Sequence, residues 1–481
     1  MLEPDLKGGP RKPHQLMGLV LGPTVFIALS LSSAPEGLSP AAWSVAALAA
    51  LMAIWWASEA VPLFVTALLP LAALPLMGIE DIRGAAAPFA HPVIFLLLGG
   101  FLIGLALEKW NLHRRLAFHI ILAVGSRPLG LIAGAMLATA FLSMWITNTA
   151  TTIMILPIAI SLIAVVARDG EGGGDGGKNE AANFGTAMML GIAYAASIGG
   201  MASLVGSPTN LLAASYLEEV FSIEMTFAAW MAFALPIATV LLGAAYIVLT
   251  RIAFPVSNRL GDVSTDAVKE MLREMGSMSW PEIRVCAVFA TVAAAWIFSP
   301  VLESWFGFDI SDTVIALVGA IALFVIPANW RDRTFLLDGA AVRRLPWEVL
   351  ILFGGGLSLA KAIDTTGLAV WIGNGLDFLT TMPLFVLIFG VTLLVLLLTE
   401  LMSNTATVAA FLPIAGSLAL GTDLAPVLIV LPLALSASAA FMLPVATPPN
   451  TLVFGTGYVS LPQMMRAGVL LNIFGALIIA A

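Results

Sequence analysis

The chain has 481 residues, of which 60% are hydrophobic and only 10% are charged, and its mean hydropathy is +1.01. This composition is typical of a polytopic membrane protein and excludes a water-soluble fold; the net charge of −8 gives no reason to expect a nucleic-acid partner. Long runs rich in Leu, Ala and Gly predict membrane-spanning helices, because a transmembrane barrel would show ten-residue stretches of alternating polarity. One Cys and four His leave little scope for thiol or imidazole chemistry.

Taken in order, the apolar runs predict eleven membrane-spanning helices. We expect them at residues 16–34, 41–58, 61–78, 89–109, 184–217, 226–254, 283–302, 311–328, 347–371, 425–456 and 464–481. Residues 1–15 are basic and lack the short apolar stretch and cleavage site of a secretory signal, so the first span is predicted to be retained.

Two further apolar stretches, 127–167 and 383–418, each carry a polar motif at the centre. The first motif, SMWITNTAT from Ser143, matches the second, TELMSNTAT from Thr399, without a gap. The chain is therefore predicted to be an internal duplication.

A second pair of motifs supports the duplication. GSPTN from Gly206 matches ATPPN from Ala446. This pair lies closer together along the chain than the first pair, and the difference equals the length of the polar, glycine-rich stretch 168–183 in the first copy. We predict that this stretch is an inserted loop.

The basic residues indicate how the chain crosses the membrane. If the N-terminus is cytoplasmic and both motif stretches enter and return, all of the 21 Lys and Arg except Arg83 and Lys361 lie inside. Two complete spans per stretch would give the same charge pattern. The polar centre favours a re-entrant hairpin, because non-helical backbone at membrane depth needs protein or water around it.

This topology starts the first copy outside and the second copy inside, so the two repeats are predicted to be inverted. We expect scaffold helices at 16–88, a first repeat at 89–254, a cytoplasmic linker with scaffold helices at 255–346, and a second repeat at 347–481. Inverted repeats with hairpins and interrupted helices are typical of secondary transporters, whose site lies at the repeat interface near mid-membrane.

The motifs contain the groups that a small cation and an anion need. Asn and hydroxyl side chains supply neutral oxygens, which suit sodium, whereas calcium usually recruits carboxylates. Pro208 and the pair Pro448-Pro449 are expected to break the spans 184–217 and 425–456, which frees backbone carbonyls and exposes helix N-termini that favour an anion. A single such motif is more often a kink or a contact between helices, but its duplication in register favours a site.

Glu400, next to the second motif, is the charged residue that is hardest to interpret. A carboxylate within a span is costly, so either a structural partner or water access, or a role in coupling, must explain it. Both explanations stay open at this point. The matched glycines at 99, 100 and 354–356 indicate close helix packing rather than ligand contacts.

Over nearly its whole length the sequence resembles the divalent anion/sodium symporter family, which carries dicarboxylates, citrate and, in some members, sulfate. The family signature is a Ser-Asn-Thr at each of two opposed hairpin tips, which stands here as Thr147-Asn148-Thr149 and Ser403-Asn404-Thr405. The resemblance implies an all-α membrane protein with an elevator mechanism, a homodimer, sodium as the co-transported ion and no organic cofactor.

The resemblance also implies the site residues. One sodium site would use Ser143, Thr147, Asn148 and Gly206, and the other Thr399, Met402, Asn404 and Ala446. The substrate would contact Asn148, Thr149, Ser207, Pro208, Asn404, Thr405, Thr447 and Pro448. Two positions depart from the family pattern: Thr147 replaces a Ser, and Thr209 stands where a second proline is common.

We therefore expect a multi-pass carrier of a bacterial inner membrane that imports a di- or tricarboxylate with sodium, and we favour a C4-dicarboxylate such as succinate. A sodium-independent dicarboxylate exchanger and a sulfate/sodium symporter remain alternatives. An intramembrane enzyme is disfavoured because the spans offer neither paired Asp nor a His partner for Ser. A channel is disfavoured because broken helices facing hairpin tips suit alternating access. The small anion, sodium and membrane lipid are the expected partners.

Overall fold

The computed structural model describes residues 11–171, 174–257, 265–307, 311–375, 382–422 and 424–481. These residues form helices and one short hairpin, β1 (Pro327–Asn329) with β2 (Thr334–Phe335). Among them, nine helices are long and apolar enough to cross a membrane, or up to ten if the bent pair α18 and α19 is one span. The predicted all-α membrane class is confirmed, although the helix count differs from the predicted eleven.

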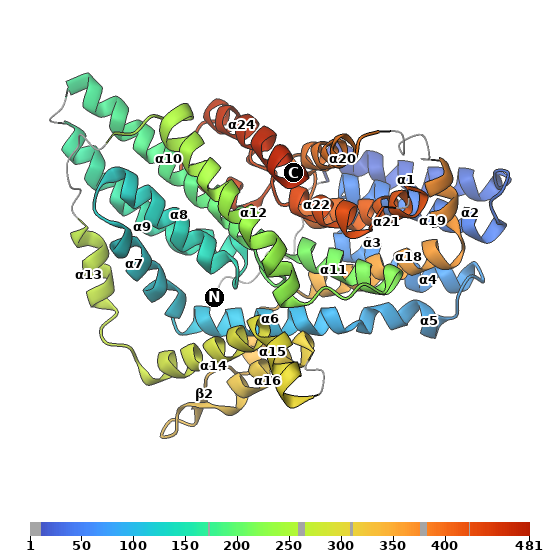
Figure 1. Ribbon diagram of the computed structural model, residues 1–481, viewed down its shortest axis with the longest axis horizontal. Coiled ribbons are helices and arrows are strands. Elements are labelled where there is room, and N and C mark those ends of the chain that lie inside the picture. Colours follow the sequence, from blue (N-terminus) through green and yellow to red (C-terminus); the bar gives the residue numbers. More distant parts are fainter. Residues whose placement is uncertain (1–10, 172–173, 258–264, 308–310, 376–381, 423) are drawn as a thin grey trace. The chain divides into compact units, whose positions relative to one another are not determined.

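The chain folds into two compact units (Figure 1). The first unit contains α1 (Pro13–Leu31), α2 (Pro40–Ser58), α3 (Leu63–Ala67), α4 (Leu69–Leu76), α5 (Ile82–Ala86), the 3-10 turn η1 (Ala87–Ala90), α18 (Trp347–Thr365), α19 (Leu368–Gly375) and the later part of α21 (Asn404–Thr422). Within it α18 packs against α2, α3, α4 and η1. The carbonyl oxygen of Ala67 would lie 2.1 Å from a Cβ added to Gly355, which confirms close packing at that glycine.

The second unit contains the four motifs. Its helices are α6 (Pro92–Lys109), α7 (Leu112–Val124), α8 (Pro128–Ser143), α9 (Asn148–Glu171), α10 (Gly174–Met201), α11 (Pro208–Phe221), α12 (Phe227–Ile247) with the π-helical turn η2 (Val248–Ala253), α13 (Asp266–Glu274), α14 (Trp280–Ile297), α15 (Ser299–Phe306), α16 (Asp312–Val325), α17 (Gly339–Val342), α20 (Leu384–Thr399), the first turn of α21, α22 (Val427–Ala437), α23 (Pro448–Gly455) and α24 (Leu461–Ala480).

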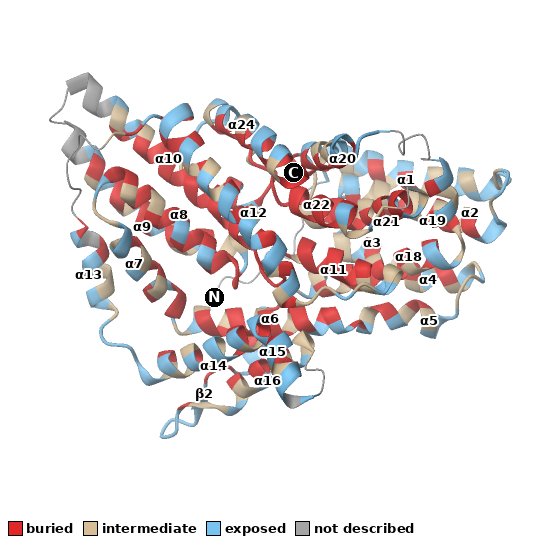
Figure 2. Ribbon diagram, in the orientation of Figure 1, coloured by how far each residue is buried: buried red, intermediate tan, exposed pale blue. Residues whose placement is uncertain are grey.

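Helix α10 is the core of the second unit. Residues 184–201 of α10 are all buried, and Figure 2 shows this part of the helix in red. It packs against α8, α9, α12 and α23. Small residues allow this packing: a Cβ added to Gly199 would lie 2.2 Å from the carbonyl oxygen of Ala140 on α8. The end of α10 is thus held beside the end of α8, where the first motif begins.

The duplication also appears in the helix boundaries. When Ser143 is aligned with Thr399, four pairs of helices have matching boundaries. Helices α6 and α18 end at matching residues, α7 and α19 begin at matching residues, α8 and α20 match at both ends, and α9 and α21 begin at matching residues. In the register that aligns Gly206 with Ala446, α11 and α23 begin at matching prolines, each in the first turn, where a missing N–H costs nothing. The repeats therefore share a helix pattern as well as two motifs.

Three of the predicted spans without a proline motif are not continuous helices. The span 61–78 is divided into α3 and α4, because Pro70 cannot donate a hydrogen bond to the preceding turn. Pro300 has the same effect in 283–302, where α14 ends and α15 begins. The span 347–371 bends by 75° between α18 and α19, at Gly367, whose φ of +80° is left-handed.

The predicted loop at 168–183 is wrong for most of its length. Helix α9 continues to Glu171 and α10 already begins at Gly174, so only residues 172–173 lie outside the described part. The apolar arms on either side continue as helices into the polar stretch, although its glycines have weak helix propensity. By contrast, the polar part of the predicted linker contains a short charged helix, α13.

Candidate functional site

The first hairpin joins α8 and α9 through residues 144–147. The buried Ser143 donates a hydrogen bond of 2.6 Å from Oγ to Asn148 Oδ1, across the turn. The ring of Trp145 in the turn lies at 5.1 Å from the Phe289 ring, edge to face, and at 5.9 Å from the Phe227 ring, stacked. The aromatic contacts anchor the turn, so the Ser–Asn pair is held on a rigid support.

The first helix break, residues 202–207, lies between α10 and α11 and is held by Asn210. This fully buried side chain donates from Nδ2 to the carbonyl oxygens of Gly200 at 2.9 Å, Met201 at 3.3 Å and Ser203 at 2.7 Å. Ser203 Oγ donates in turn to the carbonyl oxygen of Met144 at 2.5 Å. The break is therefore attached to the hairpin turn by a direct hydrogen bond.

Oxygen atoms from the turn and the break come together around two glycines. A Cβ added to Gly206 would lie 2.6 Å from the Gly200 carbonyl oxygen and 3.0 Å from that of Ser143. A Cβ added to Gly200 would lie 2.5 Å from Asn148 Oδ1. Three predicted residues, Ser143, Asn148 and Gly206, are thus neighbours. The fourth, Thr147, is exposed and its Oγ1 accepts from Ala150 N at 3.3 Å, so it caps α9.

The second hairpin repeats the Ser–Asn pair with a threonine. Thr399 Oγ1 lies 2.7 Å from Asn404 Oδ1 and 2.8 Å from the carbonyl oxygen of Ala437, the last residue of α22. Thr399 is fully buried, as is Ser143. The matched side chains at the two tips therefore make matched contacts in the two repeats.

The second break, residues 438–447, is held by Asn450 as the first is by Asn210. Asn450 Nδ2 donates to the carbonyl oxygens of Ala440 at 3.2 Å and Leu443 at 3.0 Å. Thr447 Oγ1 accepts from the backbone N–H of Asn450 at 3.3 Å, which caps α23. Both predicted discontinuous helices are therefore present.

A chain of hydroxyl groups connects the two breaks. Ser207 Oγ lies 2.7 Å from Thr209 Oγ1, which lies 2.9 Å from Ser438 Oγ at the end of α22. All three side chains are buried. Thr209, where a second proline is common in the resembled family, is thus one link between the repeats.

The sequence of the chain matches a known family over almost its whole length. The family described as the sodium:sulfate symporter transmembrane region matches residues 14–481. The chain belongs to this family. It is therefore a multi-pass membrane transporter and not an enzyme.

The relatives of the chain include two transporters from staphylococci. The sodium-dependent dicarboxylate transporter SdcS of Staphylococcus saprophyticus is 37% identical over 468 residues, which cover 97% of this chain and 90% of that protein. SdcS of Staphylococcus aureus strain USA300 is 36% identical over 478 residues, with coverage of 98% and 91%.

Two solved structures are similar in fold. Neisseria gonorrhoeae MtrF matches with a TM-score of 0.60 at 13% identity and covers 98% of this chain and 95% of its own. The Alcanivorax borkumensis YdaH transporter matches with a TM-score of 0.52 at 12% identity, with coverage of 97% and 96%. At these identities the likeness concerns the fold alone, and it is a transporter fold.

In this transporter, the predicted substrate residues share one structural position. All eight lie at the N-cap or in the first turn of a helix: Asn148 and Thr149 on α9, Ser207 and Pro208 on α11, Asn404 and Thr405 on α21, and Thr447 and Pro448 on α23. Backbone N–H groups without helical partners and the positive end of the helix dipole make such termini favourable for anions.

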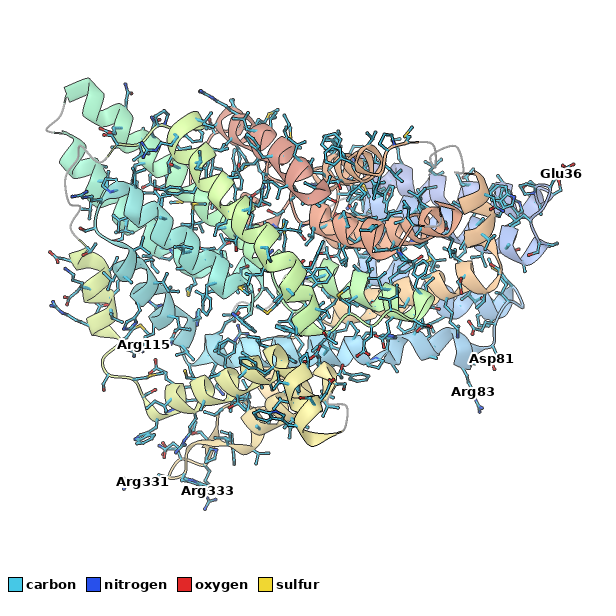
Figure 3. All side chains as sticks on the ribbon, in the orientation of Figure 1. Glu36, Asp81, Arg83, Arg115, Arg331 and Arg333 are labelled. Carbon is cyan, nitrogen blue, oxygen red and sulfur yellow. The ribbon has the colours of Figure 1, made fainter. Side chains whose placement is uncertain are left out.

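The ion pairs of the basic side chains lie outside the motifs. Lys361 Nζ contacts Glu80 at 2.8 Å, and the buried Arg115 contacts Glu282 at 3.0 Å. Lys109 Nζ donates to Asp338 at 2.9 Å and lowers the pKa of that carboxyl group. Arg115 is labelled in Figure 3, where Arg331 and Arg333 project from the β1–β2 turn. No group of three or more His, Cys, Asp or Glu that could hold a metal ion occurs in the described parts of the chain.

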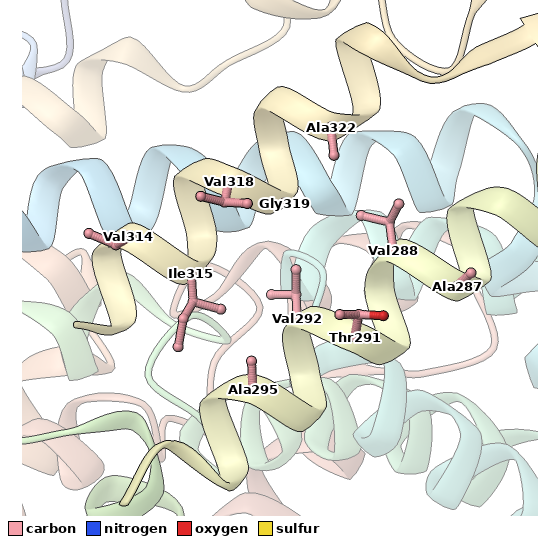
Figure 4. A pocket seen from close by; sticks show the side chains of 10 residues that line it. All are labelled: Ala287, Val288, Thr291, Val292, Ala295, Val314, Ile315, Val318, Gly319 and Ala322. Carbon is pink, nitrogen blue, oxygen red and sulfur yellow. The ribbon is translucent and has the colours of Figure 1, made fainter. Parts of the chain in front are cut away.

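A cavity of about 410 Å³ lies elsewhere, between α14 and α16 (Figure 4). Its walls are apolar side chains such as Val292 and Ile315, with the hydroxyl group of Thr291 as the polar exception. It contains none of the predicted site residues. This lining offers an anion no charged or amide partner, so the motifs remain the candidate functional site.

Sequence reasoning did not include several residues that build this site. Asn210, Asn450, Ser203 and Ser438 orient the breaks, and Gly200 contributes a carbonyl oxygen close to Asn148. The asparagines carried a signal, since each ends its motif at the same place in both copies. Gly200, Ser203 and Ser438 lie outside the four motifs, and only the folded structure brings them into contact with motif residues.

Proposed function

We propose that this protein imports C4-dicarboxylates such as succinate across the plasma membrane together with sodium. The observation that carries the proposal is the matched hydroxyl–asparagine pair at the two hairpin tips, 2.6 Å for Ser143–Asn148 and 2.7 Å for Thr399–Asn404. Each pair adjoins a broken helix. The relatives named as sodium-dependent dicarboxylate transporters support the choice of ion and substrate class.

The first sodium site would be made of oxygens from Ser143, Thr147, Asn148 and Gly206, and the second of oxygens from Thr399, Met402, Asn404 and Ala446. Hydroxyl, amide and carbonyl oxygens carry no net charge, which suits a monovalent hard cation. Gly200 and Gly206 leave no room there for a side chain, so the oxygens of Asn148, Gly200 and Ser143 stay close together.

The dicarboxylate would bind at the four helix N-termini, through Asn148, Thr149, Ser207, Pro208, Asn404, Thr405, Thr447 and Pro448. No Lys or Arg lies within the motifs, so sodium and the helix termini would balance the two negative charges. Moving each charge into a negative interior is opposed by about 2.3 kcal/mol per 100 mV, so more than two sodium ions per dianion make the movement favourable.

The movement itself is proposed to be an elevator in a homodimer, as the family resemblance implies. The hairpins would be re-entrant, the repeats inverted and the N-terminus cytoplasmic, which leaves 127–167 and 383–418 opening to opposite sides of the membrane. The placement of the basic residues supports this topology.

The test is uptake of labelled succinate into proteoliposomes, with an inward sodium gradient or with potassium in its place. Uptake only with sodium is the expected result. Uptake that ignores sodium but requires internal dicarboxylate would instead identify an exchanger. Labelled sulfate, with succinate as competitor, separates a sulfate carrier from a dicarboxylate carrier, and liposomes without protein provide the background.

A further inference from the structure

Glu400 lies in the second hairpin turn, one residue after Thr399, and only 3% of it is exposed. Its Oε1 accepts hydrogen bonds from Phe441 N at 2.8 Å, Met442 N at 2.9 Å and Asn472 Nδ2 at 2.7 Å. Its Oε2 accepts from Leu443 N at 3.0 Å. Three successive backbone N–H groups surround the carboxylate, an arrangement that favours an anion. All four donors are neutral, so they satisfy its oxygens without cancelling its charge.

These hydrogen bonds attach the hairpin turn to the second helix break. Leu443 is held from both sides, because its carbonyl oxygen also accepts from Asn450 Nδ2 at 3.0 Å and from Ala446 N at 3.2 Å. Ala446 is the residue whose backbone carbonyl oxygen is proposed to bind sodium at the second site. Glu400 thus fixes the position of that carbonyl relative to Thr399, which belongs to the same site.

The first repeat makes the same attachment without a charge. Aligning the hairpin motifs places Met144 opposite Glu400, and aligning the proline motifs places Ser203 opposite Leu443. Ser203 Oγ donates to the Met144 carbonyl oxygen at 2.5 Å. The same two positions therefore connect turn and break in both repeats, through a hydroxyl group in one and a carboxylate in the other.

We propose that Glu400 is a positioning residue that makes the two sodium sites unequal. It sets the backbone geometry of the second site and adds a negative charge beside it, so this site binds sodium more tightly and fills first. A buried charge with neutral partners is costly, and a sodium ion close by offsets that cost while gaining affinity itself. The inference rests on the proposed function and extends it to the order of binding.

The experiment compares the sodium dependence of succinate uptake by the wild type and by Glu400→Gln. We expect the half-saturating sodium concentration to rise about tenfold in the variant, while the half-saturating succinate concentration at saturating sodium changes less than about twofold. Glu282→Gln is the control for the loss of a buried carboxylate away from the motifs, since Glu282 is buried on α14 and hydrogen-bonded to the backbone N–H of Ser279, although it is also paired with Arg115. This control is expected to keep the wild-type sodium dependence.

A role in stability alone would lower the melting temperature of Glu400→Gln in detergent and leave the half-saturating sodium concentration unchanged, which would overturn the inference. If Glu400→Gln does not fold, Glu400→Asp provides the test, because it keeps the charge and is expected to stay within about threefold of the wild type. A tenfold rise in Glu400→Asp would overturn the role of the charge. Wild-type uptake that ignores sodium would overturn the proposed function and, with it, this inference.

Discussion

The two helix breaks occupy equivalent positions in the repeats but are held by different side chains. The carbonyl oxygen of Met201 accepts from Trp230 Nε1 at 2.9 Å, and that of the matched Phe441 accepts from Tyr194 OH at 2.8 Å. Asn210 makes three hydrogen bonds to its break, whereas Asn450 makes two from Nδ2. The same backbone positions are thus held by hydrogen bonds in both repeats, although the second break begins four residues earlier and the side chains that hold the two breaks have diverged.

The comparison makes the two tip asparagines equivalent. We expect Asn148→Ala and Asn404→Ala each to reduce sodium-driven succinate uptake by about a hundredfold, because each removes the amide oxygen that Ser143 or Thr399 orients. Proteoliposome uptake at fixed protein density measures the loss. Ser304→Ala, at an exposed hydroxyl group on α15, is the control. If one asparagine variant transports normally, the two tips do not have the same role.

The glycine of the first break and the alanine of the second give the next contrast. A Cβ on Gly206 would lie 2.6 Å from a backbone oxygen, so Gly206→Ala must displace the break, at a cost of about 2–3 kcal/mol. We expect a lower melting temperature and a raised half-saturating sodium concentration. Ala446→Gly, at the matched position, needs no displacement and is expected to retain most uptake. Equal effects of the two variants would contradict the inference that position 206 has no room for a Cβ.

Asn210 and Asn450, which hold the two helix breaks, are expected to contribute unequally to stability. Asn210→Ala leaves three carbonyl oxygens without this donor and is expected to cost about 3 kcal/mol, whereas Asn450→Ala leaves two and is expected to cost about 2 kcal/mol. Thermal unfolding of the purified proteins in detergent ranks the two variants. The reverse order would show that bonds other than those of Nδ2 dominate at the second break.

Much of this arrangement could be predicted from the sequence, because each motif occurs in both repeats. Both hairpin turns lie within the motifs, and both spans with a proline motif are broken. The helix breaks at Pro70 and Pro300 were not predicted, because each depends on a single proline inside an apolar run and hydropathy does not distinguish a broken run from a continuous one. The partners of Glu400 are backbone N–H groups and Asn472, which is far away along the chain, so no sequence pattern could reveal them.

Thr209 gives the smallest expected effect and the sharpest test of divergence, since the matched position holds Pro449. Thr209→Pro would make the breaks alike, and proline is tolerated in the first turn of α11. The variant loses the 2.9 Å contact with Ser438, so we expect a cost of about 1 kcal/mol in stability and less than about a twofold change in uptake. Thr209→Val, which loses the hydroxyl group and keeps the shape, is the control. A larger loss with proline than with valine would mean that the backbone of the first break, and not its hydroxyl link to the other repeat, requires threonine here.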